Sequence, residues 1–352
     1  VSLTDLQKFI IPETMTVMEA LSAIDKAAKG IIMVCEGRKL FGVLTDGDIR
    51  RFILRNGDLN TPVSEVANRN FISLSVERSS IAREETERLK LRALPIIDRN
   101  GNLISICFGQ YQIEDYCKNL NIPVVIMAGG KGTRLHPYTK VLPKPLIPIG
   151  DIPITMHIMQ HFAEYGCKQF YMIVNHQKNL IKAYYSDVDI PFQVKYIDEE
   201  IPLGTGGGIK LLEGTIEGSF FLTNCDILID ANYTDIFNFH KDKQNIITMV
   251  CATKEVVIPY GTVSVNGNGY ICKIKEKPSF SFLTNTGFYL LEPAIFKYIP
   301  ENTHIHITNI IQILIDNGEN VGMYPISDGQ WSDMGQIDDM KKMITKYHGV
   351  DI

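Results

Sequence analysis

Three glycines, a threonine and an arginine follow a short apolar run near the middle of the chain, in the stretch MAGGKGTRLHPYTKVLPKP at residues 127–145. Glycine lets the backbone approach a ligand and donate N–H groups to phosphate oxygens, and Arg134 can bind phosphate through two parallel hydrogen bonds. Lys144 adds a point charge, and a proline on each side of it restricts the backbone. We expect a triphosphate site in which the nucleotide contacts Ala128, Gly129, Gly130, Gly132 and Thr133.

The order of these residues excludes two common phosphate-binding motifs. A P-loop requires Gly-Lys-Ser/Thr in order, whereas here Lys131 precedes Gly132. A dinucleotide fingerprint requires a third glycine where this chain has Leu135. The stretch is therefore a glycine-rich phosphate loop of another kind.

The elements around this loop follow the pattern of an α/β protein. From residue 124 onward, apolar runs alternate with amphipathic stretches, which is typical of a largely parallel sheet with helices between its strands. Such sheets bind ligands at the carboxyl ends of their strands, which is where the loop falls. We predict buried strands at 124–127, 170–174, 220–224 and 246–251, and helices at 154–165, 178–185, 207–212, 233–241 and 307–315.

The first third of the chain contains two similar passages. GIIMVCEGRKLFGVLTDGDIRRFI begins at residue 30, and ALPIIDRNGNLISICFGQYQIEDY begins at residue 93. Each predicts a strand, a turn, a second strand and a helix, so two copies of one small α/β unit are expected. We predict a module at 1–118, with repeats at about 1–65 and 66–118, a linker at 119–123 and a second domain at 124–352.

The repeated unit resembles the tandem cystathionine-β-synthase (CBS) module, most closely at GVLTDGDIR, residues 42–50. In that family the threonine and the aspartate three residues later hold the ribose of a nucleotide, because a hydroxyl and a carboxylate can share its two hydroxyls. The resemblance implies an adenine or guanine nucleotide at Thr45 and Asp48. Phe108 and Tyr111 occupy these places in the second copy, so at most one site is intact.

Two alternatives to this nucleotide site stay open. Asp46 and Asp48 can simply cap a helix that begins near Ile49. The module can also serve only as a dimerisation platform, and the resemblance to CBS pairs implies a homo-oligomer in either case.

The glycine-rich stretch resembles the signature of the sugar-1-phosphate nucleotidyltransferases, which make nucleotide sugars, and the resemblance covers residues 123–347. The signature G-G-x-G-T-R-L-x-P-x-T-x-x-x-P-K-P is present without a gap. Further family landmarks follow in order: LGTGG at 203–207, NCDIL at 224–228, EKP at 276–278, NTG at 285–287 and WSDMG at 331–335. The chain departs from the family at Asn224 and Cys225, where a small residue and glycine are common. The resemblance implies a Rossmann-like, mixed but mostly parallel sheet and a catalytic domain at 124–352.

The reaction implied by this resemblance is attack of a sugar-1-phosphate oxygen on the α-phosphorus of a nucleoside triphosphate, which expels pyrophosphate. A phosphate monoester is largely a dianion at pH 7, because its second pKa is about 6, so alignment and charge neutralisation are needed and a general base is not. Asp226 and Asp333 are implied as ligands of Mg²⁺, which takes a few carboxylates together with phosphates and water. The other implied contacts are Arg134 on the β- and γ-phosphates, Lys144 on the α-phosphate or the sugar phosphate, Lys277 on the sugar phosphate, and Glu276, Asn285 and Gly287 around the sugar.

The base is predicted from the second glycine-rich segment. The resemblance places Gly204, Thr205 and Gly206 beside the nucleobase, and Glu199 and Glu200 precede them. Guanine presents N1–H and N2–H₂ as a pair of donors that suits one carboxylate, so GTP is the predicted substrate. The combination E-x-P-L-G-T-G and the CBS pair resemble guanylyltransferases of bacterial surface-sugar pathways. This implies glucosamine 1-phosphate or a related hexose or heptose 1-phosphate.

Three other interpretations stay open. The two glutamates can simply cap a loop. A uridylyl-, thymidylyl- or cytidylyltransferase uses the same scaffold, and a cytidylyltransferase for a polyol phosphate does not need the EKP segment. A nucleotide-sensing protein with a degenerate catalytic half is a third class.

Composition and charge restrict the class of protein further. The net charge of −5 argues against a nucleic-acid partner. No apolar stretch reaches the roughly 18 residues that span a bilayer, and the first residues lack a signal-peptide pattern, so we expect no membrane partner and a cytoplasmic protein. The seven cysteines form no C-x-x-C pair, which predicts buried free thiols. His304 and His306 have no third ligand nearby, so we expect surface or helix-start histidines there.

Overall fold

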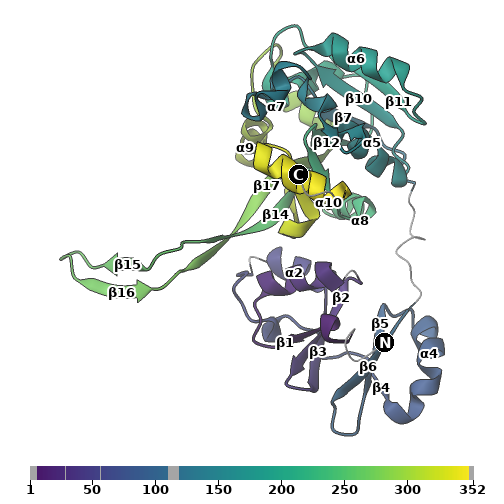
Figure 1. Cartoon of the computed structure of the whole chain (residues 1–352), viewed down its shortest axis with the longest axis vertical. Coiled ribbons are helices and arrows are strands. Elements are labelled where there is room, and N and C mark those ends of the chain that lie inside the picture. Colours follow the sequence, from purple (N-terminus) through teal and green to yellow (C-terminus); the bar gives the residue numbers. More distant parts are fainter. Residues whose placement is uncertain (1–5, 28, 56, 110–118, 349–352) are drawn as a thin grey trace. The chain divides into compact units, whose positions relative to one another are not determined.

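The computed structural model describes residues 6–27, 29–55, 57–109 and 119–348 (Figure 1). The chain forms two compact units. One contains the N-terminal module together with Ala252–Thr284 and Ser327–Gly329, and the other contains the remaining residues from Glu114 onward. Tyr111, the predicted counterpart of Asp48 in the second repeat, lies outside the described residues.

The N-terminal module contains the same arrangement twice. The first copy has β1 (Ile10–Pro12), α2 (Val17–Ala27), β2 (Ile31–Glu36), β3 (Lys39–Thr45) and α3 (Asp46–Ile53). The second has β4 (Leu74–Ser75), α4 (Ala82–Arg88), β5 (Ala93–Ile97) and β6 (Leu103–Phe108). In each three-stranded sheet the first pair of strands is parallel and the second pair is antiparallel. The strands of the two copies therefore follow the same order and directions; the helix predicted at the end of the second copy falls outside the described residues, and the bounds of the repeats stay predictions.

The two copies share one hydrophobic core. Met33 from the first copy and Ile106 from the second belong to a single cluster of buried side chains. The turns of the two hairpins also meet, because Leu40 N–H donates to Gly101 O at 3.0 Å. The shared cluster and this backbone hydrogen bond join the two copies into one module.

The second unit is built on a seven-stranded sheet with the order β11-β10-β7-β12-β17-β14-β18. The strands are β7 (Val124–Met127), β10 (Gln169–Val174), β11 (Gln193–Asp198), β12 (Phe220–Asn224), β14 (Ile247–Val257), β17 (Ser279–Leu291) and β18 (Val321–Ile326). The first four strands in this order run parallel, and β17 is antiparallel to β12. This is the mixed, mostly parallel sheet that the sequence predicts.

Five helices of this part of the chain are α5 (Ile154–Glu164), α6 (Lys178–Asp187), α8 (Tyr233–Asp242), α9 (Ile307–Asp316) and α10 (Ile337–His348). Aromatic side chains join helix and sheet: Phe162 of α5 lies 5.2 Å from Phe221 of β12 and 5.5 Å from Phe288 of β17, measured between ring centroids. The helix predicted at 207–212 is instead one turn, α7 (Gly204–Gly207), followed by a 3₁₀ segment at Gly208–Leu212, because consecutive glycines disfavour a regular helix. Within the described ranges, no helix is both long enough and apolar enough to cross a bilayer.

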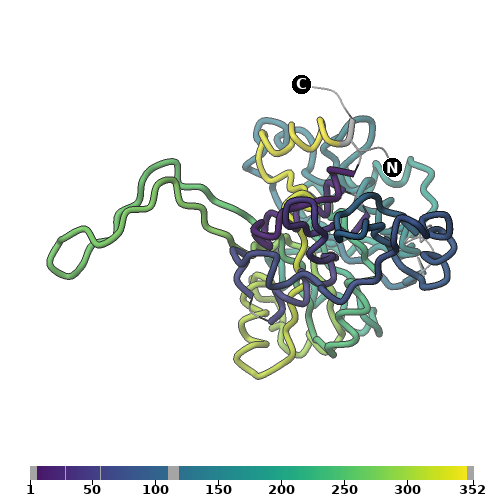
Figure 2. The backbone as a smooth tube through the Cα atoms, turned by 90° about the horizontal axis from the view of Figure 1, so that it is seen from below, coloured from purple at the N-terminus to yellow at the C-terminus, as the bar shows by residue number. Residues whose placement is uncertain are grey.

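β14 and β17 are connected by an antiparallel hairpin of β15 (Thr262–Val265) and β16 (Ile271–Lys275), drawn in green in Figure 2. None of the side chains of these two strands is buried, and Ile271 and Ile274 are at least 60% exposed. Cys272 is exposed here, so the prediction of buried thiols is wrong for this cysteine. A two-stranded ribbon has no second layer against which to bury side chains.

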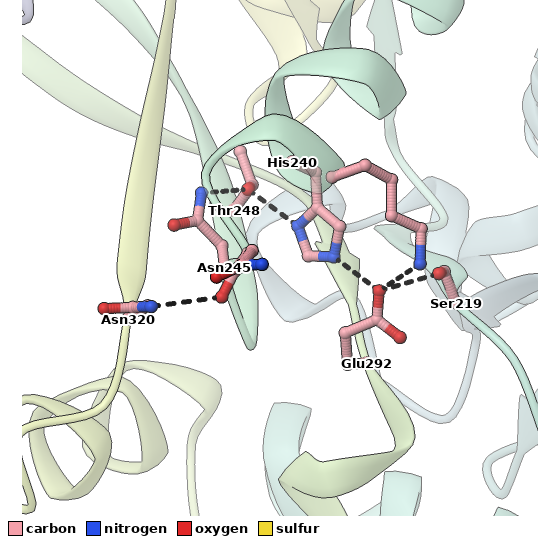
Figure 3. Close-up of polar contacts among 8 residues, drawn as sticks. Ser219, His240, Asn245, Thr248, Glu292 and Asn320 are labelled. Carbon is pink, nitrogen blue, oxygen red and sulfur yellow. Dashed lines mark hydrogen bonds and ion pairs between the residues drawn. The ribbon is translucent and has the colours of Figure 1, made fainter.

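A polar network lies at the edge where β12 begins (Figure 3). Glu292 Oε1 accepts hydrogen bonds from Ser219 Oγ at 2.8 Å and Lys241 Nζ at 2.6 Å, and it lies 3.1 Å from His240 Nε2. His240 is fully buried, and its Nδ1 lies 2.8 Å from the Thr248 hydroxyl. Burial alone would raise the pKa of Glu292, but these hydrogen bonds lower it to about 2.

Candidate active site

The site lies at one edge of the seven-stranded sheet. β7, β10, β11 and β12 are parallel, so their carboxyl ends meet at the same edge. The glycine-rich loop follows β7, Glu199 follows β11 and Cys225-Asp226 follows β12. Because β17 runs the opposite way, it brings residues 285–287 to this edge as well.

Two adjoining cavities open there. The larger, of about 570 Å³, we call the loop cavity; its lining includes residues 129–133, Lys144, Glu199 and Gly204. The other, of about 370 Å³, we call the Asn285 cavity; its lining includes Gly287, Tyr289, Trp331 and Asp333. Five side chains line both cavities and form what we call the junction: Arg134, Thr205, Asn224, Asp226 and His306.

The shape of the glycine-rich loop depends on Gly132. Its φ of 61° lies in the left-handed region, and a Cβ there would lie 2.9 Å from Thr139 Cγ2 and 3.1 Å from Lys144 Cβ. Thr139 Oγ1 donates to Gly132 O at 2.8 Å, which fixes the turn. Ala128 is buried, donates its N–H to Ile173 O and does not line the loop cavity. The structure therefore does not bring this one predicted nucleotide contact into the cavity.

Lys144 and Asp226 form a buried ion pair at the floor of the loop cavity. Burial opposes the charge of Lys144, but Asp226 outweighs this effect and the pKa of the lysine is raised. β13 (Ile227–Ile229) pairs antiparallel with β19 (Trp331–Asp333), which places Asp333 beside Asp226 although they are far apart in sequence. Burial, and next the charge of Asp226, raise the pKa of Asp333 to about 6.

The two carboxylates fit a divalent cation. Mg²⁺ accepts one or two carboxylates and completes its shell with phosphate oxygens and water. After burial, the charge of Asp226 is the next cause of the raised pKa of Asp333, and a cation held by both carboxylates would offset that repulsion. Among the described residues, no three His, Cys, Asp or Glu side chains gather into a complete metal site. Substrate and water would have to supply the other ligands of such a cation.

Glu199 and Glu200 occupy different environments. Glu199 is 5% exposed, and its Oε1 has no hydrogen-bond partner in the described part of the chain. Its carboxylate lies between two glycines: a Cβ on Gly129 would lie 2.8 Å from Oε2, and a Cβ on Gly208 would collide with Oε1. Burial raises the pKa of Glu199 to about 7, although a hydrogen bond from the Leu203 backbone opposes the shift. Glu200 is exposed and lines neither cavity.

The second glycine-rich segment contributes both lining and packing. Gly204 and Thr205 line the loop cavity. Gly206 is buried, donates its N–H to Ile305 O at 3.0 Å and lines neither cavity. A Cβ on Gly206 would lie 2.8 Å from the Ile307 nitrogen, so this glycine makes room for the start of α9.

The polar wall of the Asn285 cavity is pre-arranged. Asn285 Nδ2 donates to Tyr289 Oη at 2.7 Å, and Asn285 Oδ1 accepts from Gly287 N–H at 2.9 Å. Gly287 has a φ of 82°, and the Asn224 amide occupies the space that a side chain there would need. The departure from the family pattern at Asn224 is thus matched to a glycine on the neighbouring strand.

Sequence reasoning missed two residues of the site. His304 and His306 were predicted as surface or helix-start histidines; both are exposed, and His306 directly precedes α9. Both also line the loop cavity. The only signal in the sequence is their alternation in HIHIT, which does not reveal that the segment lies against the glycine-rich segment.

Glu276 and Lys277 lie in the other compact unit, within Ala252–Thr284. Lys277 has a positive φ of 42°, and neither residue lines the loop cavity or the Asn285 cavity. Their predicted contacts with the sugar phosphate therefore stay predictions.

Thr45 and Asp48 form a capping box at the start of α3. Thr45 Oγ1 accepts from Asp48 N–H at 3.2 Å, and Asp48 Oδ2 accepts from Thr45 N–H at 3.0 Å. These bonds start the helix at Asp46, earlier than the predicted Ile49. Helix capping is thus one role of this pair, and its predicted role in binding ribose stays a prediction.

The fold and site define an α/β protein with a glycine-rich loop and a pair of carboxylates at the carboxyl edge of its sheet. The family model described as nucleotidyl transferase matches residues 123–349, and a model described as CBS domain matches residues 4–55. The chain belongs to the nucleotidyl transferase family and carries an N-terminal CBS domain.

Curated relatives differ in the nucleotide that their names state. A UTP–glucose-1-phosphate uridylyltransferase of Synechocystis is 30% identical over 61% of this chain and 60% of its own length. A mannose-1-phosphate guanyltransferase of Yarrowia lipolytica is 32% identical over 61% of each chain. A bifunctional protein GlmU of Methanococcus maripaludis is 30% identical over 64% of this chain and 56% of its own. This chain therefore spans about three fifths of the length of these relatives.

A crystal structure of HddC from Yersinia pseudotuberculosis is similar to this chain with a TM-score of 0.51 and 23% sequence identity. The similarity covers 64% of this chain and 99% of HddC. It identifies the same fold in the second unit.

Proposed function

We propose that the protein transfers a guanylyl group from GTP to a sugar 1-phosphate. An oxygen of the sugar phosphate forms a bond to the α-phosphorus of GTP, the bond from that phosphorus to the bridging oxygen breaks, and the electron pair leaves with pyrophosphate. Atoms and charge balance without an external acid or base, because the attacking phosphate is largely a dianion at pH 7.

In this proposal the chain's own residues hold the phosphates in line. Arg134 lies at the junction, where it can bind the phosphates that leave, and Lys144 lies in the loop cavity, near the phosphate that reacts. Asp226 and Asp333 would hold Mg²⁺, which supplies positive charge to the phosphate oxygens. The nucleotide occupies the loop cavity and the sugar occupies the Asn285 cavity.

The observation that carries the choice of guanine is the buried carboxylate of Glu199. An ionised carboxylate with an unpartnered oxygen is costly unless a ligand supplies donors, and guanine N1–H and N2–H₂ supply two. Uracil and thymine offer one donor between two acceptors and leave this carboxylate poorly matched. Guanylyl- and uridylyltransferases are both among the relatives, so the choice of base is argued from the residues of the site.

The test is pyrophosphate release with Mg²⁺ from the full chain, with GTP, ITP, UTP, CTP, ATP and dTTP, each against glucosamine, hexose and heptose 1-phosphates. We expect turnover with GTP, and at least tenfold lower kcat/KM with ITP, which lacks the N2 amino group. Preference for UTP or dTTP would overturn the guanine assignment and leave the class of reaction intact. If folded protein releases no pyrophosphate with any pair of substrates, the proposed reaction itself is overturned.

The CBS domain would bind an adenine or guanine nucleotide at Thr45 and Asp48 and report its level to the catalytic domain. Titration of the full chain with AMP, ATP and GMP tests this, with Thr45→Val as the variant that keeps the shape and loses the hydroxyl. Equal affinity of the variant, or no effect of a bound nucleotide on turnover, would contradict it.

A homo-oligomer is also part of the proposal, and light scattering measures it directly.

A further inference from the structure

Residues 303–307 are held tightly against the second glycine-rich segment. A Cβ on Gly204 would lie 2.7 Å from Ile305 O, and one on Gly206 would lie 2.8 Å from the Ile307 nitrogen. The N–H groups of Gly206 and Gly207 both donate to Ile305 O, at 3.0 and 3.1 Å. The missing side chains of these glycines therefore let an extended backbone approach the floor of the site.

This approach brings two histidines to the cavity wall. In an extended chain, residues two apart point to the same side, and His304 and His306 both line the loop cavity. Their rings pack edge to face with centroids 5.1 Å apart. Only His306 of the pair also lines the Asn285 cavity, so it belongs to the junction with Arg134 and Asp226.

The hydroxyl of Thr205 lies beside one ring nitrogen of His306. Thr205 Oγ1 accepts the Ile307 N–H at 3.2 Å and lies 3.4 Å from His306 Nδ1. The threonine hydroxyl can donate its proton to Nδ1, and our proposal takes this arrangement, in which the ring proton is on Nε2. In that tautomer Nε2 carries an N–H donor on the side of the ring away from Thr205.

We propose that His306 binds substrate phosphate at the junction and donates a hydrogen bond from Nε2 to a non-bridging oxygen. This inference rests on the proposed function, which places the phosphates between the nucleotide in one cavity and the sugar in the other. Phosphate is the group that fits there, because Arg134 faces the same space and a cation at Asp226 adds positive charge. His304, on the loop-cavity side alone, contacts the nucleotide and not the sugar phosphate.

The test compares His306→Ala, His306→Gln and His304→Ala in the full chain. Loss of one hydrogen bond to a charged phosphate is expected to lower kcat/KM for His306→Ala by about tenfold to a hundredfold, measured with either substrate varied. Glutamine offers an amide N–H at a similar reach and is expected to restore activity to within about fivefold of wild type. His304→Ala is expected to raise the KM for GTP and to leave the KM for the sugar phosphate unchanged.

Asn309→Ala is the control for a merely structural role. Asn309 Oδ1 accepts a hydrogen bond from the backbone N–H of His306 at 3.3 Å, so this change loosens the start of α9 and keeps the imidazole ring. Activity of Asn309→Ala near that of wild type, together with rescue by glutamine, supports the proposal. Equal losses for Asn309→Ala, His306→Ala and His306→Gln would overturn it, and so would His306→Ala with wild-type kinetics.

Equilibrium binding of Mg·GTP separates this inference from the proposed function. If wild type binds Mg·GTP but turns over no sugar phosphate, the proposed function fails, and His306 is still judged by whether His306→Ala weakens binding at least tenfold. If wild type turns over and His306→Ala binds and turns over equally well, the histidine inference alone fails. If wild type binds no nucleoside triphosphate, both fail.

Discussion

Replacing Glu199 by glutamine is predicted to stabilise the second unit above pH 7 while weakening its binding of GTP. The carboxylate is buried between Gly129 and Gly208, with Oε1 unpartnered in the described structure. An ionised group in this position raises the free energy of the folded state, because water solvates it in the unfolded chain. Glutamine keeps the size and removes the charge.

The size of this destabilisation follows from the pKa of Glu199. Burial raises the pKa of Glu199 from 4.5 to about 7. Each pH unit between the folded and unfolded values corresponds to about 1.4 kcal/mol, so the ionised carboxylate destabilises the folded state by about 3 kcal/mol above pH 7. The unfolded chain loses its proton first as pH rises. The destabilisation therefore starts near pH 4.5, grows up to about pH 7 and then stays constant.

The assay is urea denaturation without ligand at pH 4.5, 5, 6, 7 and 8, monitored by tryptophan fluorescence. Trp331, the only tryptophan of the chain, lies in the same unit as Glu199, so the signal reports on this unit even when the whole chain does not unfold in one step. The free energy of unfolding of Glu199→Gln minus that of wild type is expected to rise by about 3 kcal/mol from pH 4.5 to pH 7. This difference cancels any constant packing effect of the amide.

Glu200→Gln is the matched control, because Glu200 is adjacent in sequence and exposed. Its stability relative to wild type is expected to stay constant over the same pH range. In binding, Glu199→Gln is expected to weaken GTP about tenfold or more, since a donor replaces an acceptor of guanine N–H groups. A pH-independent difference for Glu199→Gln, or equal behaviour of both variants, would refute the reasoning.

Three other perturbations test the rest of the molecule. Lys144→Met leaves Asp226 buried without its partner and is expected to lower the free energy of unfolding by about 3–5 kcal/mol. The double variant that also carries Asp226→Asn should recover most of that stability but no activity. Equal stability of the single and the double variant would contradict the pairing. Gly208 has an ordinary φ of −59°, so Gly208→Ala adds no backbone strain; its methyl group is expected to displace the Glu199 carboxylate and to raise the KM for GTP tenfold or more. Gly218→Ala is the control, because its methyl group meets open space, and it is expected to leave the KM for GTP unchanged. Glu292→Gln is expected to lower the free energy of unfolding by about 3 kcal/mol at pH 7 and to leave kcat unchanged. This loss of stability should disappear as the pH falls from 4.5 to 2. A loss that stays constant down to pH 2 would contradict the role of the Glu292 charge.

Four strands of the sheet (β7, β10, β12 and β14) and the phosphate loop could be predicted from the sequence because their signals are local, whereas β11, β17 and β18 were not predicted. Buried parallel strands appear as apolar runs, and each predicted run coincides with a strand to within a residue or two, apart from the far end of β14. The motif from Gly129 to Lys144 is one continuous segment, and the structure places its two ends in the lining of the same cavity. The start of α3 was predicted too late, because a capping box moves the first helical residue back to Asp46.

Features that depend on distant segments could not be predicted from the residues alone. Asp226 and Asp333 become neighbours through the pairing of β13 with β19, and only the resemblance to a family implied it. Of the adjacent residues Glu199 and Glu200, the sequence does not tell which one is buried, because the answer depends on space left by Gly129 and Gly208. His306 was placed at a helix start correctly, yet its position at the junction depends on a contact with the segment around Gly206.

Two glutamates at opposite edges of the same sheet differ in the hydrogen-bond donors that face them. Glu292, at the edge where β12 begins, receives three protein hydrogen bonds that lower its pKa to about 2. Glu199, at the edge where the parallel strands end, is more deeply buried, yet burial raises its pKa to about 7. Burial raises the pKa of both carboxylates, and the number of donors that face each one decides the final direction of the shift. The protein supplies three donors to Glu292, which stabilises the fold, whereas in the proposed function guanine supplies donors to Glu199 Oε1, so that binding would recover free energy that folding leaves unused.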